Sequence, residues 1–339
     1  MVFEFLPESP LEKGGIQVQI NRFTVMQCSV ILCTHNPRED YLRRALEGLR
    51  AQTLPLAQWE LLLIDNASQS PLAGRFDLSW HPNARLVREE DLGLAPARLR
   101  GIKESQAELL VFVDDDNVLA GDYLEQALVV GEQWPFVGVW GGSSIPEYEK
   151  PLPDWVGDQV WRLTVVTVKE DVWSKLREGF ATIPVGAGIC IRRRVGTRFV
   201  EWCRMNEKSQ TLGRKGTALS GYEDVDLAHC AMDIGMGAGR STRLHLTHLI
   251  PTSRLTLDYF LRHAEGDAAS SMMFRAIRGL PIKKPPSSFT AKIKRQMYRW
   301  FTRDPVEIIK IHQAHIKGSE RGWKLAREYL EAGKSKEQA

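Results

Sequence analysis

The sequence predicts an α/β protein in which a mostly parallel sheet is covered by helices on both faces. Short apolar runs alternate with segments whose apolar residues recur at helical spacing, which is the pattern of strands joined by crossover helices. The runs are apolar throughout, as expected of strands buried on both faces. Three of them in succession end on polar side chains. These strand ends should line one crevice, where open α/β sheets bind their ligands.

The expected elements are clearest in the first part of the chain. The predicted strands there are 28–33, 59–64, 84–87 and 109–113. The predicted helices are about 41–49, 96–105 and 123–130. Beyond Asp122 the pattern loosens, and we expect a strand over 188–192 and a β-like stretch over 243–248.

Tryptophan is concentrated in the Gly- and Pro-rich stretch 134–173. Trp155 closes a segment, Pro151-Leu152-Pro153-Asp154-Trp155, that is typical of an ordered loop. A tryptophan ring can stack on a sugar or a lipid, or it can belong to the core. The sequence leaves both interpretations open for each of these residues.

The two ends of the chain differ from its middle. Residues 1–26 form a polar leader, and residues 268–339 form a basic helical extension that follows a change in composition. Within this extension a basic Pro-rich linker, 281–286, precedes Phe289, Ile293, Met297 and Trp300 at helical spacing among lysines and arginines. Such a helix can lie on an anionic membrane surface. It can equally pack on the main domain with its basic face in solvent.

Composition excludes several classes of protein. With 43% hydrophobic and 26% charged residues among 339, the chain fits one large globular domain with an appendage, or two ordinary domains. A formal charge of +3 and the absence of a nucleic-acid-binding motif argue against a nucleic-acid partner. The five cysteines show no C-x-x-C spacing, so neither disulfides nor a zinc site is expected.

Nothing in the sequence predicts export or membrane insertion. The N-terminus lacks the basic start and apolar core of a signal peptide, and no apolar stretch reaches about 18 residues. We therefore expect a cytoplasmic protein, which can make a peripheral contact with the inner membrane face through its basic helix.

Three consecutive acids, Asp114, Asp115 and Asp116, follow directly on the apolar run 109–113. A buried strand cannot keep adjacent carboxylates inside without partners, so these acids should emerge at its end, where a cation or hydrogen-bond donors can meet them. Hard oxygen ligands suit Mg²⁺ or Mn²⁺, and such ions usually hold substrate phosphates as well. The triplet predicts a metal-diphosphate site. Taken alone, it would also fit an acidic turn that caps a helix.

Five segments in order resemble family 2 glycosyltransferases. They are 28–36, 63–68, 97–102, the acid triplet 114–116 and the pair Glu223-Asp224. The resemblance covers about residues 27–262. It implies a GT-A fold, the Rossmann-like fold of nucleotide-diphospho-sugar transferases, over 27–267. Residues 27–122 would then form a nucleotide-binding half, and 123–267 an acceptor-binding half.

The resemblance also implies roles for individual residues on the nucleotide side. The residues expected to bind the nucleotide are Cys33, Thr34, His35, Asp65, Arg98, Asp114, Asp115 and Arg254. Asp114 and Asp116 would form the DxD pair, with Asp114 nearer the ribose and Asp116 on the metal. Arg98 would face the nucleotide or bridge to an acid, unless it is an ordinary surface arginine.

Metal and acceptor roles follow in the same way. Asp116 and His248 would hold Mn²⁺ or Mg²⁺, although His248 can also be a structural histidine. Asp224 would be the general base that takes the proton of the acceptor hydroxyl. Glu223 and Trp155 would contact the acceptor. The alternative for the acid pair is an ordinary acid-rich helix N-terminus.

These roles predict a metal-dependent and inverting glycosyltransferase. Its donor would be a UDP-, GDP- or dTDP-linked sugar, and its acceptor a hydroxyl of a sugar, a lipid-linked molecule or another compound, as in polysaccharide or glycolipid biosynthesis. Two alternatives stay open at this point. One is a sugar-nucleotide pyrophosphorylase, although its Gly-rich loop is missing after the first strand; the other is a non-catalytic scaffold that binds partners through the C-terminal helix. A dehydrogenase is disfavoured because Thr34-His35-Asn36-Pro37 contains no glycine.

Overall fold

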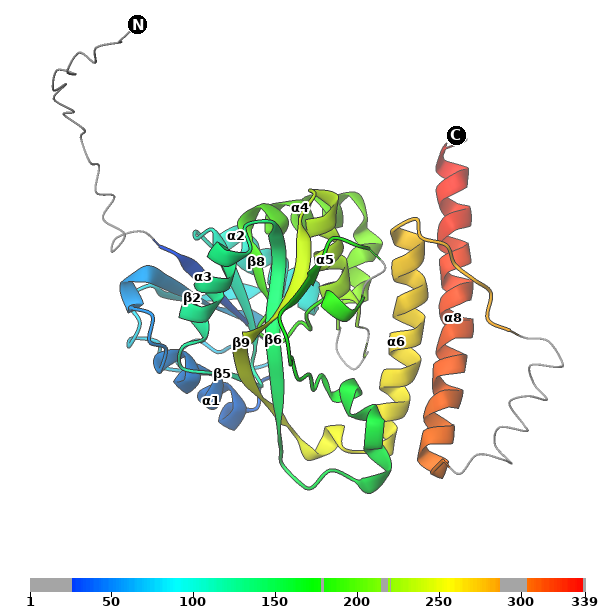
Figure 1. Cartoon of the computed structure of the whole chain (residues 1–339), viewed down its shortest axis with the longest axis horizontal. Helices are drawn as coiled ribbons and strands as arrows, with labels where there is room; N and C mark the ends of the chain where they lie inside the picture. Colours follow the sequence, from blue (N-terminus) through cyan, green and yellow to red (C-terminus); the bar gives the residue numbers. More distant parts are fainter. Residues whose placement is uncertain (1–25, 178–179, 215–218, 220, 287–303, 338–339) are drawn as a thin grey trace, which may run out of the picture.

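The computed structural model describes residues 26–177, 180–214, 219, 221–286 and 304–337, and these are organised around one nine-stranded sheet (Figure 1). Its strand order is β3-β2-β1-β4-β8-β6-β9-β5, with β7 paired to β9. The strands are β1 Cys28–Thr34, β2 Trp59–Asn66, β3 Ala84–Glu89, β4 Leu109–Asp114, β5 Asn117–Leu119, β6 Val137–Tyr148, β7 Val172–Ser174, β8 Cys190–Arg192 and β9 Gly237–Ile250. The four strands predicted before residue 114 are all present.

The long strand pairings are parallel. β3, β2, β1 and β4 pair in parallel in that order, and β6 pairs in parallel with β9 over most of its length. The antiparallel pairings, which involve β5, β7 and β8, are only two or three residues long. The predicted mostly parallel sheet is therefore confirmed. The short β8 joins the two parallel blocks.

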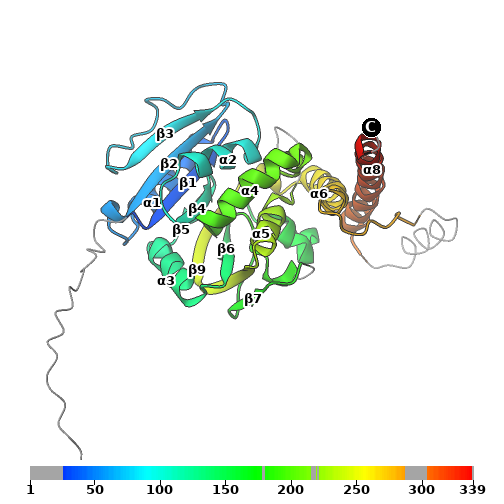
Figure 2. The same cartoon turned by 90° about the horizontal axis from the view of Figure 1, so that it is seen from above.

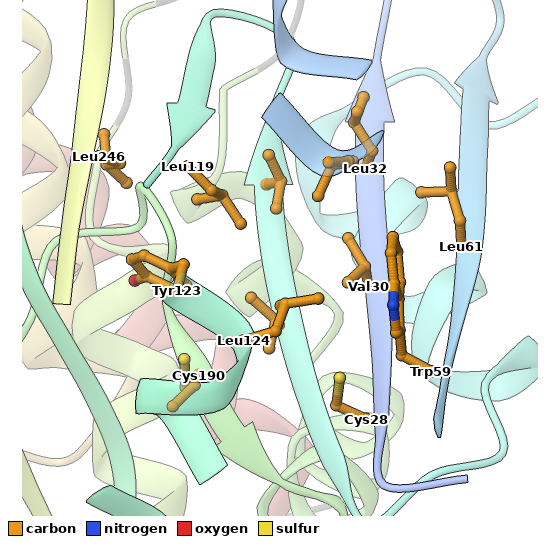
Figure 3. Close-up of a cluster of buried hydrophobic side chains, with 14 of the residues drawn as sticks. Cys28, Val30, Leu32, Trp59, Leu61, Leu119, Tyr123, Leu124, Cys190 and Leu246 are labelled. Atoms are coloured by element: carbon orange, nitrogen blue, oxygen red, sulfur yellow. The ribbon is translucent and has the colours of Figure 1, made fainter. Parts of the chain in front are cut away.

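Helices cover both faces of the sheet (Figure 2). They are α1 Glu39–Arg50, α2 Leu94–Glu104, α3 Tyr123–Gln133, α4 Arg193–Met205, α5 Glu223–Asp233, α6 Leu257–Ile277 and α8 Val306–Glu337. Helices α1 and α3 pack on one face and α2, α4 and α5 on the other. β1 is apolar throughout because both of its faces are buried. Val30 and Leu32 face the core cluster under α1 and α3 (Figure 3), and Ile31 faces the cluster under α2, α4 and α5.

Gly101 explains part of the motif 97–102. A Cβ atom at this position would lie 2.2 Å from the Cγ2 of Ile31, so α2 can approach β1 this closely only through a glycine. The same helix carries Arg98, which is buried. The close packing of α2 therefore brings an arginine to the inside of the fold.

The second half of the chain departs from the expectations. The Trp-rich stretch 134–173, in which no strand was predicted, contains the twelve-residue strand β6 and a run of 3₁₀ turns, η2 Asp154–Leu163. The β-like stretch 243–248 is the middle of the longer β9. Gly142 lies where a Cβ atom would be 2.0 Å from the carbonyl oxygen of Leu244. Glycine thus permits close strand pairing here, although it weakens the sequence signal for a strand.

Two long helices, α6 and α8, lie side by side beyond one end of the sheet (Figures 1 and 2). They run in the same direction, because Gly318 of α8 packs on Glu265 of α6 and Gly322 packs on Ala269. The predicted boundary between residues 267 and 268 falls inside α6, which continues to Ile277. The change in composition at this point therefore does not mark a domain boundary, because one helix continues across it.

Other predicted features of the termini lie outside the described residues. These are most of the leader 1–26 and the basic helix with Phe289, Ile293, Met297 and Trp300. Among the described helices, none combines the length and the apolar character that a membrane span requires.

Candidate active site

The carboxyl ends of three parallel strands meet at one edge of the sheet. Cys33 pairs with Asp114 across β1 and β4, and Thr34 pairs with Asp65 across β1 and β2. A cavity of about 300 Å³ opens at this edge. Of the predicted residues, it is lined by Cys33, Thr34, His35, Asp114, Asp115, Asp116, His248 and Arg254. Residues from distant parts of the sequence are thus brought together as predicted.

Asp116 is surrounded by nitrogen donors. Its Oδ2 lies 2.8 Å from Nη2 of Arg254 and 3.5 Å from Nε2 of His248, and its Oδ1 accepts a hydrogen bond from Nδ2 of Asn117 at 2.9 Å. The antiparallel pairing of β5 with β9 sets Asn117 directly opposite His248. Burial would raise the pKa of Asp116, but the charge of Arg254 outweighs it and holds that pKa well below its usual range.

Asp115 has the opposite environment. Its Oδ2 accepts a short hydrogen bond from Oγ1 of Thr34. Burial, followed by the charge of Asp116, raises the pKa of Asp115 to about 7. Burial likewise raises the pKa of Asp114. The three neighbouring acids are therefore not equivalent, and Asp116 is the one held as a carboxylate by an adjacent cation, Arg254.

Arg98 bridges two acids instead of lying on the surface. Its Nη1 donates to Oε1 of Glu223 at 3.1 Å, its Nη2 lies 3.8 Å from Oδ1 of Asp114, and the guanidinium stands over the ring of Phe112. Glu223 is buried as well, and its second oxygen, Oε2, has no hydrogen-bond partner among the described residues. Burial raises the pKa of Glu223 to about 7, although Arg98 opposes this.

A second cavity, of about 260 Å³, adjoins the first. Asp114, Thr164 and Arg214 line both cavities, so the two form one continuous site. Asp224 lies in the second cavity at the N-terminus of α5, and its Oδ2 accepts a hydrogen bond from the backbone N–H of Gly186 at 3.1 Å. Glu223 also lines this cavity. The predicted acid pair is therefore next to the acid triplet, across the shared wall.

Two predicted site residues do not line either cavity. Asp65 is buried beneath the loop that follows β2, where its oxygens accept hydrogen bonds from the N–H groups of Ser68 and Leu72 and from Arg88. The next residue, Asn66, lines the first cavity in its place. Trp155, expected at the acceptor, packs edge-on against Phe260 in a separate core cluster.

The sequence reasoning missed several residues that do line the site. The second cavity takes Trp161 from η2 and His263 and Asp267 from α6. Arg214 belongs to the loop before α5. No local pattern marks these residues, because they meet the acids only when the second half of the chain folds over the sheet.

Asp116 and His248 pass a simple test as ligands of a divalent cation. Nη1 of Arg254 lies 3.0 Å from Nε2 of His248, and because arginine can only donate, this nitrogen presents a lone pair. The oxygen and nitrogen lone pairs thus converge on one cationic group, the guanidinium. No group of three or more metal-binding side chains occurs among the described residues. The site fits an ion that takes its other ligands from substrate phosphates and water.

Comparison with known proteins agrees with this geometry. Residues 29–183 match the family model described as glycosyl transferase family 2. This segment, a little less than half of the chain, is similar to family 2 glycosyltransferases. The match ends before Asp224, so it covers the acid triplet but not the acid pair. It confirms the predicted resemblance and, with the observed sheet, the predicted GT-A fold class.

Individual relatives are distant. Glycosyltransferase AglE of Haloferax volcanii is 28% identical over 133 residues, which are 36% of this chain and 43% of AglE. The chain spans less than half the length of the curated relatives it matches. Among solved structures, S. aureus TarS aligns with 88% of this chain and 55% of its own, with a TM-score of 0.49 and 14% identity. The structure of S. aureus TarS 1–349 in complex with UDP aligns with 89% of this chain and 92% of its own, with a TM-score of 0.46 and 14% identity.

Proposed function

We propose that this family 2 protein transfers a sugar from a nucleotide-diphosphate sugar to an acceptor hydroxyl, with inversion at the anomeric carbon. One observation carries the proposal: two cavities share the wall formed by Asp114, Thr164 and Arg214. The first contains the acid triplet with its cations, and the second contains Asp224. A donor and an acceptor bound in these cavities would meet at the shared wall.

The chemistry assigned to the chain is simple. The acceptor oxygen attacks the anomeric carbon of the donor, the bond from that carbon to the phosphate oxygen breaks, and the nucleoside diphosphate leaves with the bonding pair. Asp224 takes the proton of the attacking hydroxyl, because its carboxylate faces the second cavity and is held there by the N–H of Gly186. No covalent intermediate on the protein is required.

The first cavity is assigned to the diphosphate. Arg254 and Arg214 line it and offer cationic groups to the phosphates. Asp116 and His248 would hold Mn²⁺ or Mg²⁺, which supplies positive charge to the leaving nucleoside diphosphate. Thr34, His35 and Asn66 would border the nucleoside at the ends of β1 and β2.

Asp65 and Arg98 have indirect roles in this proposal. Asp65 fixes the loop that positions Asn66, because its carboxylate accepts from two N–H groups of that loop and from Arg88. Arg98 positions Asp114 and Glu223 relative to one another across the shared wall. Trp155 does not line the second cavity, so we assign the acceptor contact to the residues that do.

Calorimetry with UDP, GDP and dTDP in the presence of Mg²⁺ or Mn²⁺ tests the donor assignment. We expect binding of at least one nucleotide, weakened strongly by EDTA. A hydrolysis screen of nucleotide sugars then identifies the donor sugar. If none of the three nucleotides binds, the proposed function is wrong. Formation of a nucleotide sugar from a nucleoside triphosphate and a sugar 1-phosphate would favour the pyrophosphorylase instead.

A further inference from the structure

The outer wall of the second cavity contains an exposed aromatic ring and an acid that the proposed reaction does not use. Trp161 comes from η2, and Asp267 comes from α6 one turn after His263. Trp161 lies in the segment that matches the family model, whereas His263 and Asp267 lie beyond it. Their chemistry indicates what kind of acceptor the cavity accommodates.

Trp161 is held in place although its side chain remains open to solvent. It is 49% exposed, and the guanidinium of Arg162 stacks 4.2 Å from its ring centre. Its carbonyl accepts a hydrogen bond from the N–H of Thr164 at 2.9 Å. Thr164 has a φ of 61°, a left-handed conformation that is uncommon for a β-branched residue. Strain of this kind is retained mainly at functional sites, and here it fixes the turn that presents the tryptophan.

Asp267 is a partly buried acid of α6. Its side chain makes no hydrogen bond or ion pair with any residue that the structure describes, although it lines the cavity. The charge of Arg162 favours ionisation of Asp267, and the charge of Asp224, which lines the same cavity, opposes it. A partly buried carboxylate of this kind is stabilised when a ligand donates a hydrogen bond to it.

A flat apolar ring beside two hydrogen-bond acceptors is a recognition surface for a saccharide. The C–H face of a sugar ring can stack on an indole, and its hydroxyls can donate to carboxylates. Arg98 and Arg214 also line this cavity, but Arg98 is paired with Glu223 and Arg214 is assigned to the donor phosphates, so the carboxylates of Asp224 and Asp267 disfavour phosphate or carboxylate groups on an acceptor. An alkyl chain would leave Asp267 desolvated and unpaired.

We propose that the acceptor is a neutral saccharide whose ring stacks on Trp161, with one hydroxyl donating to Asp267 and another directed to Asp224. This inference rests on the proposed function, and it names the chemical class of the acceptor. Trp161 and Asp267 are then residues that determine acceptor binding, while Asp224 acts on the reacting hydroxyl.

Saturation-transfer NMR with the full chain measures acceptor binding without any turnover. The probes are the neutral methyl glycosides of glucose, galactose and N-acetylglucosamine, with glucose 6-phosphate as the anionic counterpart and octanol as the alkyl alcohol. We expect at least one neutral glycoside to bind, with a Kd in the millimolar range, and the anionic sugar and octanol to bind at least tenfold more weakly. Trp161→Ala should weaken glycoside binding about tenfold, and Asp267→Asn severalfold.

Matched variants separate recognition from general damage. Trp173→Ala removes a tryptophan that is 47% exposed on β7, and Asp258→Asn removes an exposed acid from α6. Both should bind glycosides as the wild type does. The inference is overturned if no neutral glycoside binds, if glucose 6-phosphate or octanol binds more tightly, or if Trp161→Ala binds unchanged. Nucleotide calorimetry on the same sample decides separately whether the proposed function holds.

Discussion

Asp116 in the first cavity differs from Glu223 and Asp267 in the second in how its charge is balanced. In the first, Asp116 faces Arg254 and His248, and its pKa is held well below the usual range. In the second, burial raises the pKa of Glu223 to about 7 and that of Asp267 to about 6. An acid beside a cation remains charged. Together the two groups suit a site that binds a metal ion and a phosphate. An acid with few compensating partners takes up protons near neutral pH.

Removing Asp116 should have the largest effect, because it takes away the anionic centre of the first cavity. Asp116→Ala is expected to abolish metal-dependent nucleotide binding and to lower transfer by on the order of 10³-fold or more. Calorimetry and a transfer assay measure the two effects. Asp122→Ala is the matched control, since Asp122 is exposed and its side chain makes no capping hydrogen bond to α3. Nucleotide binding that survives Asp116→Ala would contradict the assignment of the first cavity.

Asp224 tests the second cavity alone. Asp224→Asn should lower transfer by about 10²- to 10⁴-fold, which is the usual contribution of a general base, and should leave nucleotide affinity nearly unchanged. The comparison requires kcat and a nucleotide Kd on the same preparation. Asp158→Asn, at an exposed position of η2, serves as the control. An active Asp224→Asn enzyme would mean that another group takes the proton.

Arg98 connects the two cavities, so its removal should affect stability. Arg98→Met leaves Glu223 and Asp114 without their shared cation, and breaking a buried ion pair in this way costs about 3–5 kcal/mol. Chemical denaturation measures the loss. Arg100→Met, which removes a partly exposed pair with Glu104 from the same helix, should cost about 1 kcal/mol or less. Glu223→Gln should restore part of the stability of Arg98→Met; no restoration would show that the pair is not coupled.

Arg254 should compete with a divalent cation for Asp116 and His248, since its guanidinium contacts both. Without nucleotide, Arg254→Ala is therefore expected to bind Mn²⁺ more tightly than the wild type, by about tenfold, which corresponds to roughly 1.4 kcal/mol. Electron paramagnetic resonance of free Mn²⁺ gives the affinity directly. Arg262→Ala, an exposed residue of α6, should not change it. Weaker Mn²⁺ binding by Arg254→Ala would indicate that this arginine supports the ion site.

The same contrast explains how much could be predicted from the sequence. The strands β1, β2 and β4 were predicted because both of their faces are buried, which makes them continuously apolar. The acid triplet begins at the last residue of β4, so its place at the sheet edge was predicted with the strand. His248 and Arg254 were assigned to this site only through the family resemblance, and both line the first cavity.

The second cavity was harder to predict because tertiary packing assembles it. β6 was missed because Gly141 and Gly142, which close packing requires, weaken its sequence signal. Trp155 and Trp161 lie in one turn segment, and nothing local shows that Trp155 packs into a core while Trp161 lines the cavity. Asp267 lies on α6, a helix that was not predicted. Its role depends on where that helix docks.

Glu223 gives the smallest predicted effect and the most direct test of the charge contrast. Its pKa rises from an ordinary value of 4.5 to about 7 on folding. The folded state therefore binds more protons than the unfolded state between these values, so the contribution of Glu223 to stability is present below pH 4.5 and is lost as the pH rises through 7. Glu223→Gln cannot titrate. The difference in Tm, wild type minus variant, should therefore fall by a few degrees between pH 4.5 and 7. Glu201→Gln, an exposed position on α4, should show no such trend. A constant difference for Glu223→Gln would mean that Arg98 compensates the buried charge fully, and the two cavities would then be balanced in the same way.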